Sequence, residues 1–207
     1  MENMETTKQV TVVGISGSLR VGSYTTMAMV VALKGAEQEG AKTHLINLND
    51  YDLKFCDGGD EEPTGDVLKL QKLVGSARGI ILGTPEYHGS YSGVLKNAMD
   101  LMGFDEFEGK MVGLLGVSGG MMGGFNAMNE LRTVGRTLHS WVIPSQVAIP
   151  NAASVFDKSG NITDEKIQGR LMKLGQQVAS FSKLHLASHD TAFLKAWEEA
   201  PVNPGGD

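Results

Sequence analysis

The chain has 207 residues, 41% of them hydrophobic, and a formal net charge of −6 from 18 basic and 24 acidic side chains. This length and composition fit one globular domain with extensions, and the negative charge argues against non-specific binding to nucleic acids and, more weakly, to anionic membranes. The single cysteine, Cys56, excludes an internal disulfide framework and a thiolate metal site, as expected in a reducing compartment.

Short apolar runs rich in β-branched residues alternate with amphipathic stretches along the chain. In chain order, the patterns predict strand 10–15, helix 23–39, strand 43–48, helix 66–77, strand 79–83, helix 92–102, strand 111–117, helix 124–139, strand 141–149 and helix 163–189. Residues 49–65 form a turn-rich loop. Pro144 indicates that the last strand lies at an edge of the sheet or carries a bulge.

Strands that are apolar on both faces and alternate with helices predict a parallel sheet covered on both sides. Five such strands suit a flavodoxin-like three-layer α/β/α sandwich with strand order 2-1-3-4-5, in which ligands bind beyond the carboxyl ends of strands 1 and 3. We expect one domain over residues 1–189. The segment 190–207 reads as a tail, and its Phe193, Leu194 and Trp197 are candidates for docking on a neighbouring subunit.

The loop after the first strand is rich in hydroxyl side chains and opens a predicted helix. Free backbone N–H groups and the positive end of the helix dipole favour an anion there. Arg20 adds a charged, planar group suited to phosphate oxygens. The loop matches neither a Walker A motif nor Gly-x-Gly-x-x-Gly. The alternative is an ordinary turn with Ser23 as the helix N-cap.

The loops after the third and fourth strands should reach the same edge of the sheet. The first contains Tyr87 and Tyr91 with flexible glycines, a composition that suits a flat heteroaromatic ligand. The second, residues 118–124, contains four glycines, which let the backbone approach a planar ligand closely. The alternatives are a tight turn whose tyrosines cover a neighbouring helix and a flexible loop.

Three motifs occur together with the Ser118-Gly119-Gly120 loop: SGSLR at 16–20 followed by Ser23, PEYHGS at 85–90, and LKNAMD at 95–100. In this combination the chain resembles the NADPH-dependent FMN reductase family, which includes quinone, azo- and chromate reductases, over about residues 11–185. The resemblance implies an FMN cofactor with NADPH or NADH as co-substrate. It implies ping-pong hydride transfer through flavin N5 to quinones, flavins, azo compounds or metal oxyanions, with the chemistry performed by FMN and no residue acting as a catalytic acid or base.

The resemblance also implies roles for particular residues. The FMN phosphate would be held by Ser16, Ser18, Arg20, Ser23, Tyr24 and Thr25. The isoalloxazine would be lined by Pro85, Glu86, Tyr87, His88, Gly89 and Ser90, and its pyrimidine side or the ribityl chain approached by Ser118, Gly119 and Gly120. His88 stands where the family usually has Asn. A contact through the backbone amide would tolerate His, whereas a contact through the side chain would change, and an imidazole could add a pH dependence near neutrality.

Family members commonly form dimers or tetramers, so we expect a homodimer or homotetramer with the flavin near the interface, and helix 92–102 is the first candidate surface. Lys96 and Asp100, four residues apart, read as an ion pair rather than a catalytic pair. The polar N-terminus lacks a secretory signal and no apolar run is long enough to span a membrane, which predicts a cytoplasmic protein.

Three other functions remain open at this point. A flavodoxin-type electron carrier would share the fold and FMN, although flavodoxins are usually shorter and more acidic. A flavoprotein with a regulatory role would also share them. A flavin-free hydrolase or sensor with a phosphate site is the third, but the chain has no catalytic triad, nucleophile elbow or metal-ligand spacing to support it.

Overall fold

The computed structural model describes residues 9–59 and 62–187. The strands are β1 (Thr11–Ser16), β2 (Lys42–Asn47), β3 (Gly79–Pro85), β4 (Met111–Val117) and β5 (Trp141–Ile149). The helices are α1 (Tyr24–Gln38), the 3-10 turn η1 (Leu48–Asp50), α2 (Gly65–Ser76), α3 (Gly93–Asp100), α4 (Phe104–Phe107), α5 (Phe125–Thr137), α6 (Ala152–Val155) and α7 (Glu165–Ala187). The tail predicted over 190–207, with Phe193, Leu194 and Trp197, lies outside the described residues.

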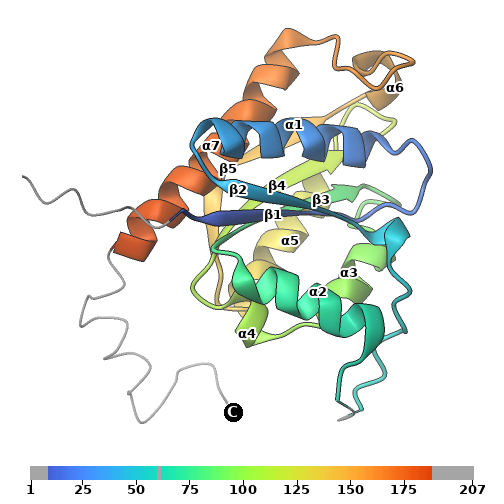
Figure 1. The fold of residues 1–207 in the computed structure, drawn as a ribbon. Helices are drawn as coiled ribbons and strands as arrows, with labels where there is room; N and C mark the ends of the chain where they lie inside the picture. The colour runs from blue at the N-terminus through green and yellow to red at the C-terminus, as the bar shows by residue number, and fades with distance from the viewer. Residues whose placement is uncertain (1–8, 60–61, 188–207) are drawn as a thin grey trace, which may run out of the picture.

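The five strands form one parallel sheet in the order β2-β1-β3-β4-β5, which confirms the predicted topology (Figure 1). All seven residues of β3 are buried, as expected for a central strand covered on both faces. The edge strand β5 carries a bulge at Pro144. Val112 of β4 lies opposite Val142, but Leu114 lies opposite Gln146, so β5 has extra residues between these two pairs. Pro144 lies within the extra residues of β5, so it is both at the edge and in a bulge.

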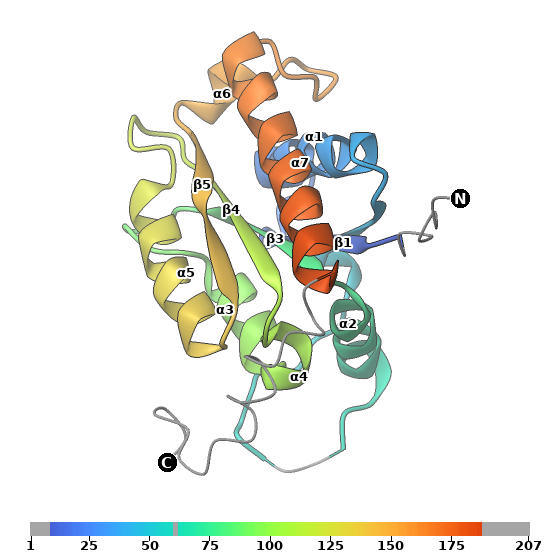
Figure 2. The same ribbon diagram turned by 90° about the vertical axis from the view of Figure 1, so that its left-hand side faces the viewer.

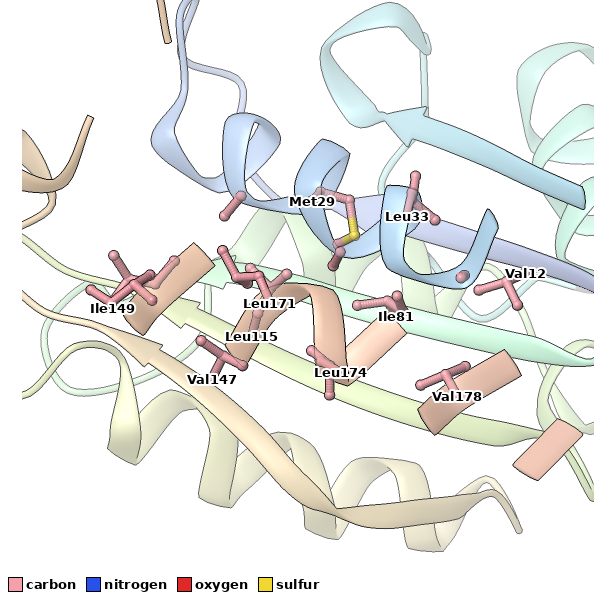
Figure 3. Packing of buried hydrophobic residues seen from close by; sticks show 14 of the residues in the cluster. Val12, Met29, Leu33, Ile81, Leu115, Val147, Ile149, Leu171, Leu174 and Val178 are labelled. Carbon is pink, nitrogen blue, oxygen red and sulfur yellow. The ribbon is translucent and has the colours of Figure 1, made fainter. Parts of the chain in front are cut away.

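Helices α1 and α7 cover one face of the sheet, and α2, α3 and α5 cover the other (Figure 1). On the first face, side chains from α7, including Leu171, Leu174 and Val178, pack with Met29 of α1 against the strands (Figure 3). The two helices of this layer approach very closely, because a Cβ atom at Gly175 would lie 1.7 Å from the carbonyl oxygen of Ala32. Glycine is therefore required where α7 crosses α1.

The sequence did not predict the one-turn helices α4 and α6 or the 3-10 turn η1, which are too short to show hydrophobic periodicity. The helix α6 matters for the site. It follows β5 after Asn151, whose φ of 46° is left-handed, and lies at the carboxyl end of the sheet beside the loop after β4 (Figure 2).

Candidate functional site

A cleft of about 220 Å³ lies at the carboxyl ends of β1, β3 and β4, at the edge of the sheet that the topology predicted. The loops after these three strands and the helix α6 form its walls. Its lining residues are Ser18, Arg20, Ser23, Tyr24, Thr25, Pro85, Glu86, Tyr87, Val117, Ser118, Gly119, Ala152 and Ala153. Pockets that enclose a whole small ligand usually measure about 300–1,000 Å³, so this cleft encloses one end of a nucleotide-sized molecule.

The first wall is the loop after β1, which brings buried hydroxyl groups next to the N-terminus of α1. Ser18, Ser23 and Thr25 are all buried. The Ser23 side chain accepts a hydrogen bond from the Thr25 backbone N–H at 3.2 Å, which confirms Ser23 as the N-cap. The first turn of α1 contains no acidic residue, so nothing in that turn offsets the positive end of its dipole. Arg20 also belongs to this wall, and its side chain is exposed to solvent.

A buried network fixes the base of this loop against β3 and α3. The Gly17 N–H donates to the Gly83 carbonyl at 2.8 Å, and Ser92 Oγ donates to the Gly17 carbonyl at 2.6 Å. Thr84 Oγ1 in turn accepts from the Ser92 N–H at 2.9 Å. A Cβ atom at Gly17 would lie 2.7 Å from Leu95 Cβ. One signal in the sequence points to Thr84, which is a hydroxyl residue in an otherwise apolar buried strand.

The second wall is a tight turn at Tyr87–Ser90. The Tyr87 N–H donates to the Ser90 carbonyl at 3.0 Å and the Ser90 N–H donates to the Tyr87 carbonyl at 3.1 Å. His88 and Gly89 have left-handed φ values of 52° and 83°, as in a type I′ turn. Asn and His are the residues enriched at such positions alongside glycine. His88 therefore keeps the backbone conformation that Asn would adopt, and its side chain is exposed outside the cleft.

Glu86 lines the cleft but its carboxylate has a partner within the chain. Its backbone N–H donates to the Val117 carbonyl at 2.8 Å, and Oε2 accepts from the Ala127 backbone N–H at 3.2 Å. Ala127 is in the first turn of α5, whose N-cap residue Gly124 has no side chain to offer. The Glu86 side chain thus caps α5.

The third wall is the loop 118–124, whose glycines differ in how closely other atoms surround them. A Cβ atom at Gly124 would lie 2.6 Å from Gly116 Cα, and the φ of Gly124 is +86°, so the fold requires glycine there. At Gly119 and Gly120 a Cβ atom would meet nothing within 4 Å, and neither residue has a left-handed φ. The chain itself needs no glycine at these two positions, which leaves an open backbone surface for a ligand.

Ten of the fifteen residues predicted for the site line the cleft. Among the others, Ser16 is fully buried and its hydroxyl pairs with Thr26 Oγ1 at 2.8 Å. His88, Gly89, Ser90 and Gly120 belong to the lining loops without lining the cleft. Val117, Ala152 and Ala153 also line the cleft and were not predicted. Val117 ends the apolar strand β4 and looked like a core residue, and the single turn of α6 shows no periodic pattern. Tyr24 stacks on Phe156 just after α6, with ring centroids 5.1 Å apart.

A second cavity of about 320 Å³ lies between α3 and α5. Its wall is mostly apolar, and Lys96 and Asp100 on its rim form the predicted ion pair within α3, with 2.6 Å between Nζ and Oδ1. Two hydroxyl side chains, Thr133 and Thr137, line it, and Thr137 Oγ1 already donates to the Thr133 carbonyl at 3.0 Å. No helix start is among its lining residues, so it is a poorer phosphate site than the first cleft. Across residues 9–59 and 62–187, no cluster of three potential metal ligands occurs and no helix has the length and apolar character to cross a membrane.

The chain is similar to known flavin-dependent oxidoreductases. A family model described as NADPH-dependent FMN reductase matches residues 10–154. The FMN-dependent NADPH-azoreductase of Staphylococcus aureus (strain USA300) is 35% identical to the chain over 179 residues, which cover 81% of this chain and 92% of that protein.

Two solved structures share the arrangement of strands and helices. The flavoenzyme NAD(P)H:(acceptor) oxidoreductase from Paracoccus denitrificans matches with a TM-score of 0.71 and 27% identity, covering 85% of this chain and 98% of that one. An NADH:FMN oxidoreductase in its apo form matches with a TM-score of 0.68 and 20% identity, covering 91% and 100%. At 20% identity, the second match shows the fold alone.

Proposed function

The chain belongs to the NADPH-dependent FMN reductase family, and we propose that the cleft beyond β1, β3 and β4 is where it holds FMN. The protein is an FMN-dependent NAD(P)H oxidoreductase, with NADPH as co-substrate. The observation that best supports this location is the pairing of buried hydroxyls at the start of α1 with an open glycine backbone across the same cleft.

The phosphate end of FMN would lie at the start of α1. Ser18, Ser23 and Thr25 would donate through hydroxyl or backbone N–H groups, and Arg20 would supply the charge. Ser16 is buried beneath the loop and would support the site indirectly, through its hydrogen bond with Thr26. Tyr24, stacked on Phe156, would form part of the floor. The residues present thus fit a phosphate group.

The flavin ring would extend from the cleft across the turn 87–90 and the loop 118–120. Both backbone N–H groups at the tip of the turn, those of His88 and Gly89, have no hydrogen-bond partner within the described residues. Donors of this kind stabilise negative charge on a reduced ring. When bound, FMN would supply the redox chemistry between the nicotinamide and the acceptor, by the hydride transfer that we propose. The protein binds, orients and tunes it, and we assign no side chain as a general acid or base.

The acceptor would be a small molecule. The relative from Staphylococcus aureus is named for azo compounds, and the proposal extends to quinones, free flavins and metal oxyanions. NADH is the alternative co-substrate. We further propose that residues 1–189 form one FMN-binding domain, that the protein is cytoplasmic, and that it acts as a homodimer or homotetramer. The exposed face of α3 beside the 320 Å³ cavity is the first candidate for the contact.

The test is an absorbance spectrum of the freshly purified protein, followed by anaerobic addition of NADPH. Bands near ~375 and ~450 nm that bleach with NADPH are the expected result. Bands that persist with NADPH and bleach with dithionite would instead favour an electron carrier or a regulatory flavoprotein. A colourless protein that takes up no added FMN would overturn the proposal.

A further inference from the structure

The turn at Tyr87–Ser90 needs support from outside itself. Its first and last residues, Tyr87 and Ser90, form a single antiparallel bridge that belongs to no strand. A hairpin this short is not stable alone in water. The position of Tyr87, which lines the cleft, therefore depends on what holds the two ends of the turn.

Both ends are held by the same helix. Before the turn, the Glu86 carboxylate accepts from the Ala127 backbone N–H at 3.2 Å. At its far end, Ser90 Oγ donates to Glu130 Oε2. Ala127 and Glu130 are three residues apart, so they lie on one face of α5. The helix α5 also follows directly from the glycine loop 118–124, which means that it sets the spacing between two walls of the cleft.

Glu130 itself is exposed and does not line the cleft. On the premise of the FMN site proposed above, we propose that Glu130 is a positioning residue for the flavin. Through the Ser90 hydroxyl it fixes the turn 87–90, and with it Tyr87 and the free N–H groups of His88 and Gly89, against the ring. No proton or electron passes through Glu130.

The test compares Glu130→Ala, Ser90→Ala and the double variant with the wild-type protein. FMN affinity is measured by titration of the apo-protein, and the midpoint potential of the bound flavin is measured at saturating FMN. Each single variant should weaken FMN binding about 3- to 10-fold and shift the midpoint potential, because a hydrogen bond to a charged group is lost at a solvated site. The double variant should be no weaker than the singles, since both remove one interaction.

Two further variants separate positioning from general effects. Glu130→Gln keeps an acceptor oxygen for Ser90 and should restore most of the affinity and the potential. Glu165→Ala removes an equal side chain and charge from the exposed start of α7 and should change neither. The melting temperature of each apo-protein should stay near wild type, because exposed substitutions usually change stability by little.

Several outcomes would decide against this role. Wild-type FMN binding with unchanged affinity and potential in both single variants would overturn the role of Glu130 and leave the FMN site standing. Additive losses in the double variant would do the same, because Ser90 and Glu130 would then act separately. A wild-type protein that binds no FMN would overturn the proposed function, and the role of Glu130 with it.

Discussion

The glycines of the loop 118–124 divide by what surrounds them. Gly124 fills a space bounded by the backbone of Gly116, whereas Gly119 faces open space in the cleft. A glycine that the fold does not require, placed in a binding cleft, is a sign of close ligand approach. Substitution at the two positions should therefore separate binding from folding.

Gly119→Ala should leave the melting temperature of the apo-protein nearly unchanged and weaken FMN binding by roughly tenfold, since one methyl group intrudes on the ligand. Flavin fluorescence titration and thermal unfolding measure the two effects. Gly124→Ala is the matched control and should instead lower stability, because of its left-handed φ and the 2.6 Å contact. A Gly119→Ala protein with full FMN affinity would place the ligand away from this loop.

Arg20 and Val21 are neighbours on the exposed part of the loop after β1, and only Arg20 lines the cleft. Arg20→Ala should weaken FMN retention by about 10- to 100-fold, as expected for loss of a charged hydrogen bond to phosphate. Val21→Ala, at a side chain that is 88% exposed, should have no effect. Turnover at saturating FMN should stay close to wild type. Unchanged retention with lost turnover would contradict the role of Arg20 as an anchor.

How far the residues of the site could be predicted depended on the distance to their partners. The order of neighbouring residues was enough to find the hydroxyl cluster and the cap Ser23, whose bond reaches only two residues along the chain. Glu86 bonds to Ala127, 41 positions away. No local pattern contains that contact, so its capping role appeared only in the structure.

Among the elements, the helices α1 and α7 cross at very close range. The periodic patterns predicted both helices within two residues of their ends, but not that they touch through glycine. A Cβ atom at Gly175 would meet the α1 backbone, and α1 cannot move away without disturbing its packing on the sheet.

Gly175→Ala should reduce the free energy of unfolding by about 1–3 kcal/mol or more, through overpacking against backbone. Gly169 lies in the same helix, and a Cβ atom there would meet nothing within 4 Å. Gly169→Ala should therefore leave the free energy of unfolding unchanged or raise it by about 0.5–1 kcal/mol through helix propensity. Chemical denaturation of the two variants gives the comparison. Equal stability of both would show that the helices separate more easily than the packing indicates.

Lys110 caps the C-terminal end of α2. It is only 5% exposed, and its Nζ donates to the carbonyls of Val74 and Gly75 at the end of α2, at 2.8 Å each. Burial lowers the pKa of Lys110 to about 8; Arg78 adds to the lowering and Glu106 opposes it. A neutral amine still has protons to donate, so both bonds survive deprotonation.

This pKa predicts a rise in stability at alkaline pH. Below pH 8 both the folded and the unfolded chain keep the proton, so the cost of burying the charge is fully present. Between pH 8 and the ordinary lysine value of 10.5 the folded state alone loses it, and the free energy of unfolding should rise by about 2 kcal/mol. Urea denaturation of the wild type and Lys110→Met across this range gives the difference. Parallel pH curves for the two proteins would contradict it.

For the whole molecule, the fold could be predicted because the strand and helix periods and the rules for parallel sheets act together. They gave the strand order and the edge of the sheet where loops converge. They could not give the contribution of α6, since a single helical turn carries no period. The cleft therefore has a wall that only the folded chain reveals.

Because FMN would bind three loops and the start of α1 together, it should stabilise the molecule as a unit. At FMN concentrations of about 100 times Kd, the free energy of unfolding should rise by about 2.7 kcal/mol. For a chain of this size this means a melting temperature roughly 5–10 °C higher. Differential scanning calorimetry with and without FMN measures it, with riboflavin as the control that lacks the phosphate. An equal shift with riboflavin would argue against the phosphate site.

The bulge at Pro144 limits how copies of the chain can join. An exposed edge strand normally offers a row of N–H and carbonyl groups on which another chain can add a strand. In β5 the proline removes one donor, and the Arg132 side chain occupies the carbonyls of Ile143 and Pro144 at 2.9 Å each. This edge is therefore blunted against a continuous sheet running from one copy into the next, which also guards it against fibrous aggregation. Copies of the chain would then have to associate through helical surfaces, and β5 would stay an unpaired edge strand of the enzyme.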